Sequence, residues 1–526
     1  MTAPALYHSL PPSAACLPTV ILALLAPLLP LLAALAPRVE SGPSRAKLVH
    51  GSLLGSLAAA VVTALLVGLH GEAHSLCFQV DSLTAVMLLL VSFLGAVVTR
   101  YGCHYLAGDP GQSRFAKWLA LTLTSVLTLI VSGNLLLFAV AWAATSLTLH
   151  KLLTFYPARP AALLAANKKF LFSRVGDLCL IAGLALAWRC FGTWDFQEMF
   201  SASANLSSGC VVPLAFLLVL AALLKSAQFP FHSWLPDTME TPTPVSALMH
   251  AGIINAGGFL VVRLSPILVN VPAALNALAI TGAFTALFAS VVMLTQTSIK
   301  RSLAYSTIAQ MGFMMLQCGL GAFSLAVLHI VAHSLYKAHA FLSSGSVVAL
   351  KKAAWSPTER PAAHPGILVG TLIAAIALTA GMGALFGLRW DADPGVLLLG
   401  TIFLMALAYL FWSLWATTHE PALLVKGLLA GAGASGAYFG LHAGFERLLA
   451  GSIPHYAPER SPMEAAVMIG VAALFMAVTI LQAQLPCWST SRRMRALYVH
   501  ISNGAYLGTW ANLLTARIFK NASTTI

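Results

Sequence analysis

Several basic side chains lie inside segments of this chain that are apolar enough to cross a membrane. Lys225 stands near the end of one such segment, and His329, His333 and Lys337 recur at every fourth position of another. Residues four apart share one face of an α-helix, so the last three form a stripe of titratable groups. A lysine at the centre of a spanning helix costs about 2.5 to 3.5 kcal/mol on insertion scales, so such a residue indicates function. The chemistry indicated is movement of protons or other cations.

A proton relay needs groups that can lose and regain charge inside the membrane. Burial disfavours the charged forms of lysine and histidine, whereas arginine stays protonated. Arg174 is therefore not expected to carry protons, and together with Asp177, three residues further along, it predicts an internal ion pair. The residues that qualify for a proton or cation pathway are Lys225, His250, His329, His333 and Lys337.

Each candidate also has a simpler interpretation. A single buried histidine such as His250 is more often a hydrogen-bonded packing residue than a relay. His329 and His333 have a spacing that metal ligands use, but no nearby Asp, Glu or Cys completes a set, so neither a metal site nor a cofactor is expected in this chain. A lysine can also extend from a helix end to water. The apolar sequence around Lys225 and Lys337 favours function for both.

The composition predicts an all-α polytopic membrane protein. Of the 526 residues, 59% are hydrophobic and only 9% are charged, whereas soluble domains carry roughly 25% charged residues. The eight cysteines form no paired motif, so neither a metal knuckle nor a disulfide framework is indicated, and they are expected to be small apolar fillers. Apolar runs of about 20 residues, enough to cross a bilayer, predict about 15 transmembrane helices. They lie near 17–36, 51–69, 82–101, 116–132, 134–153, 168–190, 212–230, 244–264, 273–294, 302–320, 323–350, 366–388, 396–418, 422–447 and 462–484.

The basic residues that give the net charge of +13 are distributed over the loops between the expected helices, so the charge does not indicate a nucleic-acid partner. With the N-terminus outside, 21 basic residues fall on one side of the membrane and 5 on the other. The positive-inside rule then predicts a multi-pass protein of the bacterial inner membrane with a periplasmic N-terminus. The basic residues assigned to the cytoplasmic side are Arg38, Arg45, Lys47, Arg100, Arg114, Lys117, Lys151, Arg159, Lys168, Lys169, Lys300, Arg301, Lys351, Lys352, Arg360, Lys426, Arg492, Arg493, Arg495, Arg517 and Lys520.

The cytoplasmic segment 231–243 is exceptional because it carries Asp237 and Glu240 but no lysine or arginine. A short loop tolerates this charge, although a role in partner binding or proton uptake is an alternative. Four prolines between positions 228 and 244 also prevent one continuous helix here. Broken helices at membrane depth are tolerated where the freed backbone groups line a polar cavity, so a break is expected between Lys225 and His250.

Several of these motifs resemble the proton-transporting membrane subunits of respiratory complex I and the Mrp antiporters, over roughly residues 80–350. The resemblance implies two inverted repeats of five helices, with broken helices in the spans 212–230 and 366–388. It also implies a central polar axis in which Lys225, His250, His333 and Lys337 relay protons. The motifs that carry the resemblance are Lys225 to Asp237, Pro242 to Gly252, Arg174 to Asp177, Lys300 to Thr307 and His329 to Ser346.

The chain departs from those relatives at two places. The segment Ala141 to Thr145 contains Trp142 but lacks the glutamate that follows this tryptophan in complex I subunits, where it pairs with the lysine at the position of Lys225. The span 366–388 contains no lysine, aspartate or glutamate. A complete antiporter cycle through the first half is therefore not expected.

The segment Leu497 to Tyr506, with Phe229 to His232 and Ile253 to Phe259, resembles the DabB membrane subunits of inorganic-carbon accumulation complexes. This resemblance implies a DabA-type partner, similar to a β-type carbonic anhydrase, that carries zinc. The function implied is a membrane subunit that conducts a cation, H⁺ or possibly Na⁺, and couples its gradient to CO₂ hydration and bicarbonate accumulation by the partner. The chain itself would not be an enzyme.

Two other functions stay open. One is a cation/proton antiporter subunit of the Mrp or complex I type, which the missing glutamate disfavours. The other is a structural membrane anchor whose relay has decayed. The segment 493–520 is expected to be an amphipathic helix that binds either the membrane surface or the partner.

The expected organisation has five parts. They are N-terminal transmembrane helices at 1–115, a first five-helix repeat at 116–265, a second repeat at 266–418, C-terminal transmembrane helices at 419–485 and a cytoplasmic amphipathic tail at 486–526.

Overall fold

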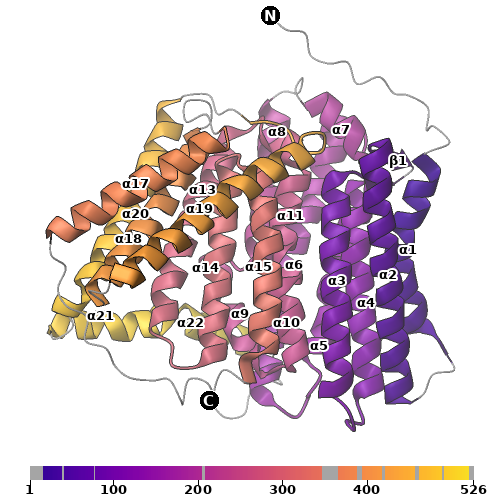
Figure 1. Ribbon diagram of the computed structural model, residues 1–526. Helices are drawn as coiled ribbons and strands as arrows, with labels where there is room; N and C mark the ends of the chain where they lie inside the picture. The colour runs from indigo at the N-terminus through magenta and orange to yellow at the C-terminus, as the bar shows by residue number, and fades with distance from the viewer. Residues whose placement is uncertain are drawn as a thin grey trace, which may run out of the picture. The chain divides into compact units, whose positions relative to one another are not determined.

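The computed structural model is built almost entirely of α-helices (Figure 1). It describes residues 16–37, 41–75, 77–203, 208–345, 365–387, 394–417, 421–456, 461–488 and 491–519. Within these ranges, 11 helices are long and apolar enough to cross a membrane, and two shorter apolar helices accompany them. The all-α membrane architecture is confirmed, and the total of about 15 spans stays a prediction.

One compact unit contains residues 1–155 and 184–202. Helices α1 to α4 of this unit pack against one another, and α5 packs on α4. A short antiparallel hairpin connects α2 to α3. The elements of this unit are α1 (Cys16–Leu35), α2 (Gly42–His70), β1 (Ala73–Ser75), β2 (Phe78–Val80), α3 (Ser82–Tyr105), α4 (Gln112–Val131), α5 (Leu135–Leu153), the end of α6 (Pro160–Phe191) and α7 (Phe196–Ser203).

Aspartate side chains cap the starts of α3 and α7 in this unit. Asp81 accepts a hydrogen bond from the backbone N–H of Thr84, 2.7 Å away, at the start of α3. Asp195 precedes α7, and its Oδ2 lies 3.3 Å from Nε2 of His74. Burial opposes ionisation of Asp195, but the His74 contact and two backbone N–H donors outweigh it and hold the Asp195 pKa below its usual range.

The second unit contains residues 156–183 and 203–526, and it holds every residue of the predicted pathway. Helices α18 and α20 pack on α13 to α15 through a cluster of buried apolar side chains that includes Leu316, Leu325 and Leu399. Its long helices are α8 (Ser208–Lys225), α13 (Pro272–Leu294), α14 (Ile299–Gly319), α15 (Phe323–Leu342), α17 (Pro365–Leu385), α18 (Pro394–Thr417), α19 (Pro421–Leu449) and α20 (Pro462–Trp488).

The expected break between Lys225 and His250 is confirmed. Helix α8 ends at Lys225, and six short elements replace a continuous helix: η1 (Phe231–Ser233), α9 (Trp234–Asp237), η2 (Thr238–Glu240), α10 (Thr243–Ala251), η3 (Ile253–Asn255) and α11 (Ala256–Arg263). Side chains satisfy freed backbone groups here. The Phe229 N–H donates to Oγ1 of Thr285, and the Gln228 amide donates to the Ser226 carbonyl.

The second expected break, in the span 366–388, is wrong. Helix α17 is uninterrupted from Pro365 to Leu385. Pro365 is the only proline in that helix and stands at its first position, where the missing N–H removes no intrahelical hydrogen bond. The interior of α17 therefore contains no proline of the kind that interrupts the segment after Lys225.

Cys190 and Cys210 are each disulfide-bonded, so the expectation that the cysteines are apolar fillers does not hold for these two. The absence of a paired cysteine motif in the sequence did not indicate these bonds. The cysteines at 77, 103, 179 and 318 are free.

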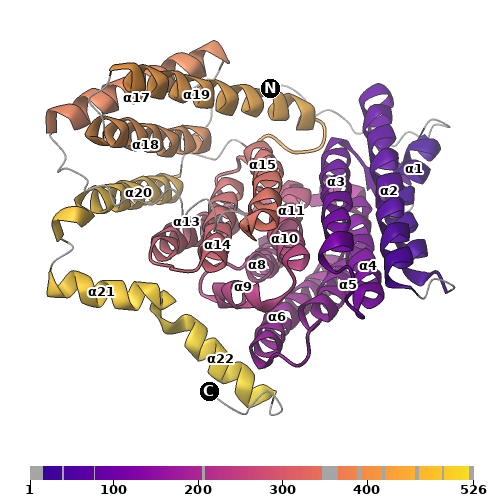
Figure 2. The same ribbon diagram turned by 60° about the horizontal axis from the view of Figure 1, so that its bottom comes forward.

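Two C-terminal helices, α21 (Arg492–Ser502) and α22 (Leu507–Ile518), are joined by the turn η4 (Gly504–Tyr506) and lie across one end of this unit's long helices (Figures 1 and 2). The Gln296 amide donates to the Ser502 carbonyl over 3.1 Å. A Cβ on Gly504, whose φ is +58°, would lie 2.8 Å from the Tyr305 hydroxyl. The tail is thus helical and held at the start of α14, while its role at a membrane surface or partner stays a prediction.

Glycines allow α13 and α14 to cross with their backbones in contact. A Cβ on Gly282 would lie 2.5 Å from the Leu316 nitrogen, and one on Gly312 would lie 2.5 Å from the Ala286 nitrogen. Small residues at such crossings are the usual means of close helix packing in membranes.

We expect Gly312→Leu to lower the melting temperature of the purified protein, because the added side chain must push α13 away from α14 at a cost of about 1 to 3 kcal/mol. Thermal unfolding in detergent measures this effect. The matched control is Gly433→Leu in α19, where an added Cβ meets no atom within 4 Å. Equal melting temperatures for the two variants would contradict the proposed close crossing.

Candidate ion pathway

Lys225 belongs to a buried cluster of charges on α6 and α8. Its side chain is only 7% exposed, and it lies within electrostatic range of Arg174 and Asp177. Lys169, 3% exposed, interacts with the same three residues. Arg174 Nη2 lies 2.7 Å from Asp177 Oδ2. Asp177 thus supplies a carboxylate to three cations rather than to Arg174 alone.

A second ion pair joins α6 to the broken segment. The Lys168 ammonium, whose side chain is fully buried, donates to the Asp237 carboxylate of α9. Arg301 and His232 lie within electrostatic range of Lys168. One acidic residue of the segment 231–243, Asp237, is therefore paired with a buried lysine.

The other acidic residue of this segment, Glu240, has its Oε2 4.0 Å from Nη1 of Arg159, and both side chains are about half exposed. Exposed pairs of this kind contribute about 0 to 1 kcal/mol. The two acidic residues of the segment thus differ in their partners: Asp237 forms an ion pair with a buried lysine, and Glu240 contacts an arginine at the surface.

The role of Lys168 and Lys169 was not evident from the sequence, in which both residues were expected on the cytoplasmic side. Helix α6 begins at Pro160, so both lysines lie inside the helix and are buried. One signal was available: the acidic segment 231–243 has no lysine or arginine of its own.

His250 and Lys337 form the second group of buried bases, between α10, α14 and α15. His250 is fully buried, and its Nδ1 lies 3.1 Å from Oγ1 of Thr307. Its ring stacks on Phe341 with centroids 4.3 Å apart. Lys337 is fully buried as well, donates to the Leu303 carbonyl over 3.4 Å, and lies within electrostatic range of His250.

The predicted stripe on α15 continues away from Lys337. The rings of His333 and His329 are 6.0 Å apart between centroids. His329 Nδ1 lies 3.0 Å from Oε1 of Gln317. His333 is 5% exposed, and among the described residues neither of its ring nitrogens has a hydrogen-bond partner. In a neutral imidazole one nitrogen carries a proton and the other can accept one, so His333 has the chemistry to take up a proton at one nitrogen and release it from the other.

Hydrogen bonds of the broken segment connect the two groups of bases. Ser226, directly after Lys225, donates to the carbonyl of Ile254 over 2.7 Å. The next residue, Asn255, donates to Oγ of Ser334 on α15 over 2.8 Å. Ser334 follows His333, so two polar contacts lead from the end of α8 to the histidine stripe.

The arrangement brings His250, His329, His333 and Lys337 into one sequence of neighbouring bases, and it places Lys225 in the adjoining α6 cluster. Lys225 and Lys337 face the protein interior rather than lipid, because both are buried. Among the described residues no three His, Cys, Asp or Glu side chains are arranged to hold a metal ion.

Two family models match the chain. Residues 132–359 match the transmembrane domain of NADH:quinone oxidoreductase and Mrp antiporters, and residues 71–116 match the N-terminus of complex I chain 5. The solved structure of the Mrp complex from Dietzia sp. superposes with a TM-score of 0.61 at 23% identity, covering 97% of this chain and 60% of that one. The fold and the axis of buried bases define a membrane subunit of the complex I and Mrp antiporter class.

Similarity to curated proteins identifies the family within this class more closely. The similarity is 42% identity over 457 residues with the probable inorganic carbon transporter subunit DabB2 of Halothiobacillus neapolitanus, covering 85% of this chain and 81% of that relative. The probable inorganic carbon transporter subunit DabB of Hydrogenovibrio crunogenus is 43% identical over 319 residues, and the matched region covers 60% of each of the two chains. NAD(P)H-quinone oxidoreductase chain 5 of Synechocystis is 41% identical over 278 residues, and the matched region covers 52% of this chain and 41% of that relative. The chain belongs to the DabB family of membrane transporter subunits.

Proposed function

We propose that this chain conducts cations, with the proton as the favoured ion, and that their flow drives CO₂ hydration and bicarbonate accumulation by a DabA-type partner subunit. The observation that carries the proposal is the fully buried Lys337 beside His250 and the His329–His333 stripe. Three curated relatives are named as probable inorganic carbon transporter subunits, which supports the choice of process.

The proton would move between bases that the fold holds at short range. Thr307 and Gln317 orient His250 and His329, and the Leu303 carbonyl orients the Lys337 ammonium. His333 lies between His329 and Lys337 on α15 and has both nitrogens available within the described structure. The passage of one charge down a membrane potential of 100 mV releases about 2.3 kcal/mol. If this release were coupled to CO₂ hydration in the partner, hydration would become effectively irreversible.

Asp177 would compensate for the glutamate that is missing after Trp142. A buried lysine without a counter-charge is costly, and removal of one partner of a buried pair costs about 3 to 5 kcal/mol. Asp177 is the carboxylate within electrostatic range of Lys225, so it would stabilise the protonated lysine from α6 instead of α5. In this proposal Arg174 and Asp177 are more than a self-neutralising pair.

The remaining parts of the proposal concern setting and assembly. The chain would lie in the bacterial inner membrane with a periplasmic N-terminus, and its partner would carry the zinc. The division into two inverted five-helix repeats at 116–265 and 266–418 is retained as part of the proposal. The helices α21 and α22 would bind the membrane surface or the partner on the cytoplasmic side.

A second candidate function is a cation/proton antiporter subunit, which the matched Mrp and complex I family model favours. Purification of the complex separates the two. We expect a zinc-containing protein of the carbonic anhydrase class to co-purify with the chain, and CO₂ hydration to require that protein. The matched control is the chain purified alone, which should hydrate no CO₂. Absence of any zinc protein, together with cation/proton exchange by the chain alone in vesicles, would instead establish the antiporter.

A further inference from the structure

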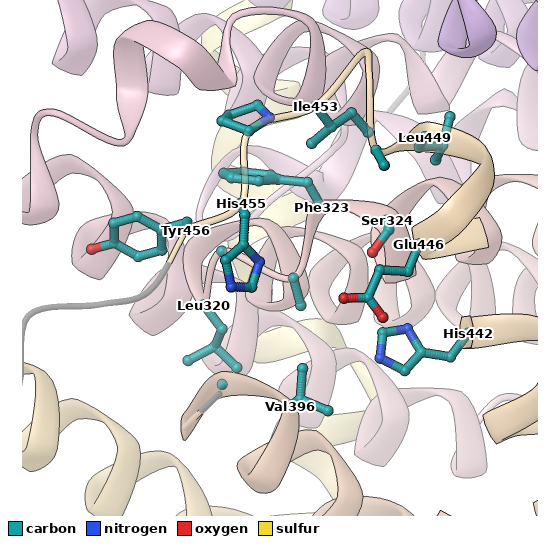
Figure 3. Close-up of a pocket in the computed structure, with 15 residues that line it drawn as sticks. Leu320, Phe323, Ser324, Val396, His442, Glu446, Leu449, Ile453, His455 and Tyr456 are labelled. Carbon is teal, nitrogen blue, oxygen red and sulfur yellow. The ribbon is translucent and has the colours of Figure 1, made fainter. Parts of the chain in front are cut away.

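A cavity of about 380 Å³ opens beside the first turn of α15 (Figure 3). Its wall comes from the turn between α14 and α15, the start of α18, the end of α19 and the segment after α19. Four polar side chains face this space, namely Ser324, His442, Glu446 and His455. The cavity is thus polar at one side and is closed by Leu320, Phe323 and Val396 at the other.

The polar groups of this cavity suit a proton or a hydrated monovalent cation. His442 and Glu446 are four residues apart on α19 and so share one helix face. Glu446 is exposed, whereas His442 is only 6% exposed, so the pair runs from the solvent-facing rim to a buried position. A carboxylate at the rim attracts cations, and an imidazole behind it can accept a proton.

The cavity lies at the end of the histidine stripe. Ser324 precedes His329 by five residues, a rise of about 7.5 Å along α15. Leu320, in the cavity wall, is three residues from Gln317, which contacts His329 over 3.0 Å. The cavity therefore adjoins the last base of the proposed pathway.

The end of α14 and α15 that lies opposite the cavity carries the basic residues. Helix α14 begins with Lys300 and Arg301, and the basic helix α21 packs beside α13 at that end. The charge distribution assigns that end to the cytoplasm, so the cavity at the end of α14 and start of α15 faces the periplasm.

We propose that this cavity is the periplasmic port of the ion pathway, with Glu446 capturing the cation and His442 passing a proton toward His329. The inference rests on the proposed function, since a port requires a conducted ion. It assigns a binding site for a proton or monovalent cation to four residues outside the central axis. Both ions can bind the Glu446 carboxylate, but only a proton can be passed on by the His442 imidazole, and external pH and sodium concentration distinguish them.

The test measures uptake of labelled inorganic carbon by cells that make the full chain and its partner. Glu446→Gln should slow uptake about ten-fold at limiting external cation, because local concentration of the ion by charge is lost. Raising external proton or sodium concentration should restore the rate, and the ion that does so is the one conducted. The matched control is Glu198→Gln, an exposed acid on α7 outside the cavity, which should leave uptake unchanged.

A second variant keeps the proposal testable if Glu446→Gln does not accumulate. Ser324→Cys should react with a membrane-impermeant thiol reagent added outside intact cells, and the reaction should stop uptake. The unsubstituted chain treated with the same reagent is the control.

Three outcomes separate the port from the pathway itself. Loss of uptake in Lys337→Ala with normal uptake in Glu446→Gln, or no effect of the reagent on Ser324→Cys, overturns the port and leaves the proposed function standing. Normal uptake in Lys337→Ala overturns the proposed function and the port with it. Loss in all three supports both.

Discussion

Replacing Lys337 with alanine should abolish inorganic-carbon uptake while the protein still accumulates in the membrane. Lys337 is the fully buried base between His250 and the His329–His333 stripe, so its removal interrupts the pathway. Folding should be spared, because the variant removes a buried ammonium whose desolvation opposes folding. The measurement is growth in air of a host without carbonic anhydrase, together with uptake of labelled inorganic carbon.

Two further variants define what Lys337 does. Lys337→Arg keeps the charge but cannot release a proton, so a proton relay predicts that it is as inactive as the alanine variant. Lys426→Ala removes an exposed lysine on α19 and should behave as wild type. Normal growth of Lys337→Ala would show that the chain only anchors its partner, and activity of Lys337→Arg would show that the charge alone is required.

The second large effect is expected from Asp237→Asn, which should destabilise the protein by about 3 to 5 kcal/mol. The substitution leaves the fully buried Lys168 ammonium without its carboxylate, and an uncompensated buried charge is costly. The broken segment that contains α9 should be affected first, because this ion pair fixes it to α6. Thermal unfolding in detergent and limited proteolysis near residue 237 measure the loss.

Matched variants separate charge from shape at this pair. The double variant Lys168→Met with Asp237→Asn removes both charges and should recover most of the lost stability. Glu240→Gln disrupts only the exposed contact with Arg159 and should change stability by about 0 to 1 kcal/mol. Equal melting temperatures for Asp237→Asn and wild type would refute a structural role for the Lys168–Asp237 pair.

The sequence indicated those residues of the proposed pathway that contrast with the residues around them. A lysine inside an apolar run such as Lys337 is conspicuous because its burial is expensive, and the prolines after Lys225 mark a break because they lack an N–H. The stripe of His329, His333 and Lys337 follows from helix periodicity alone. These features are local in the chain.

Features that depend on distant contacts were not predicted. Lys168 and Lys169 stand at the edge of an apolar run, where buried lysines look the same as loop lysines, and Asp237 is 69 residues from Lys168. The α17 break was inferred from resemblance rather than from a proline in the segment, and the helix is continuous. The cavity at Glu446 combines residues from three separate segments, so no local pattern indicates it.

The most direct test uses sealed right-side-out membrane vesicles from cells that make the chain with its partner. Bicarbonate inside the vesicles is measured after CO₂ is supplied, with and without an imposed cation gradient. The account predicts accumulation that requires the gradient, collapses with an ionophore and is absent in vesicles containing Lys337→Ala. Accumulation of the same size without a gradient, or in the Lys337→Ala vesicles, would contradict it.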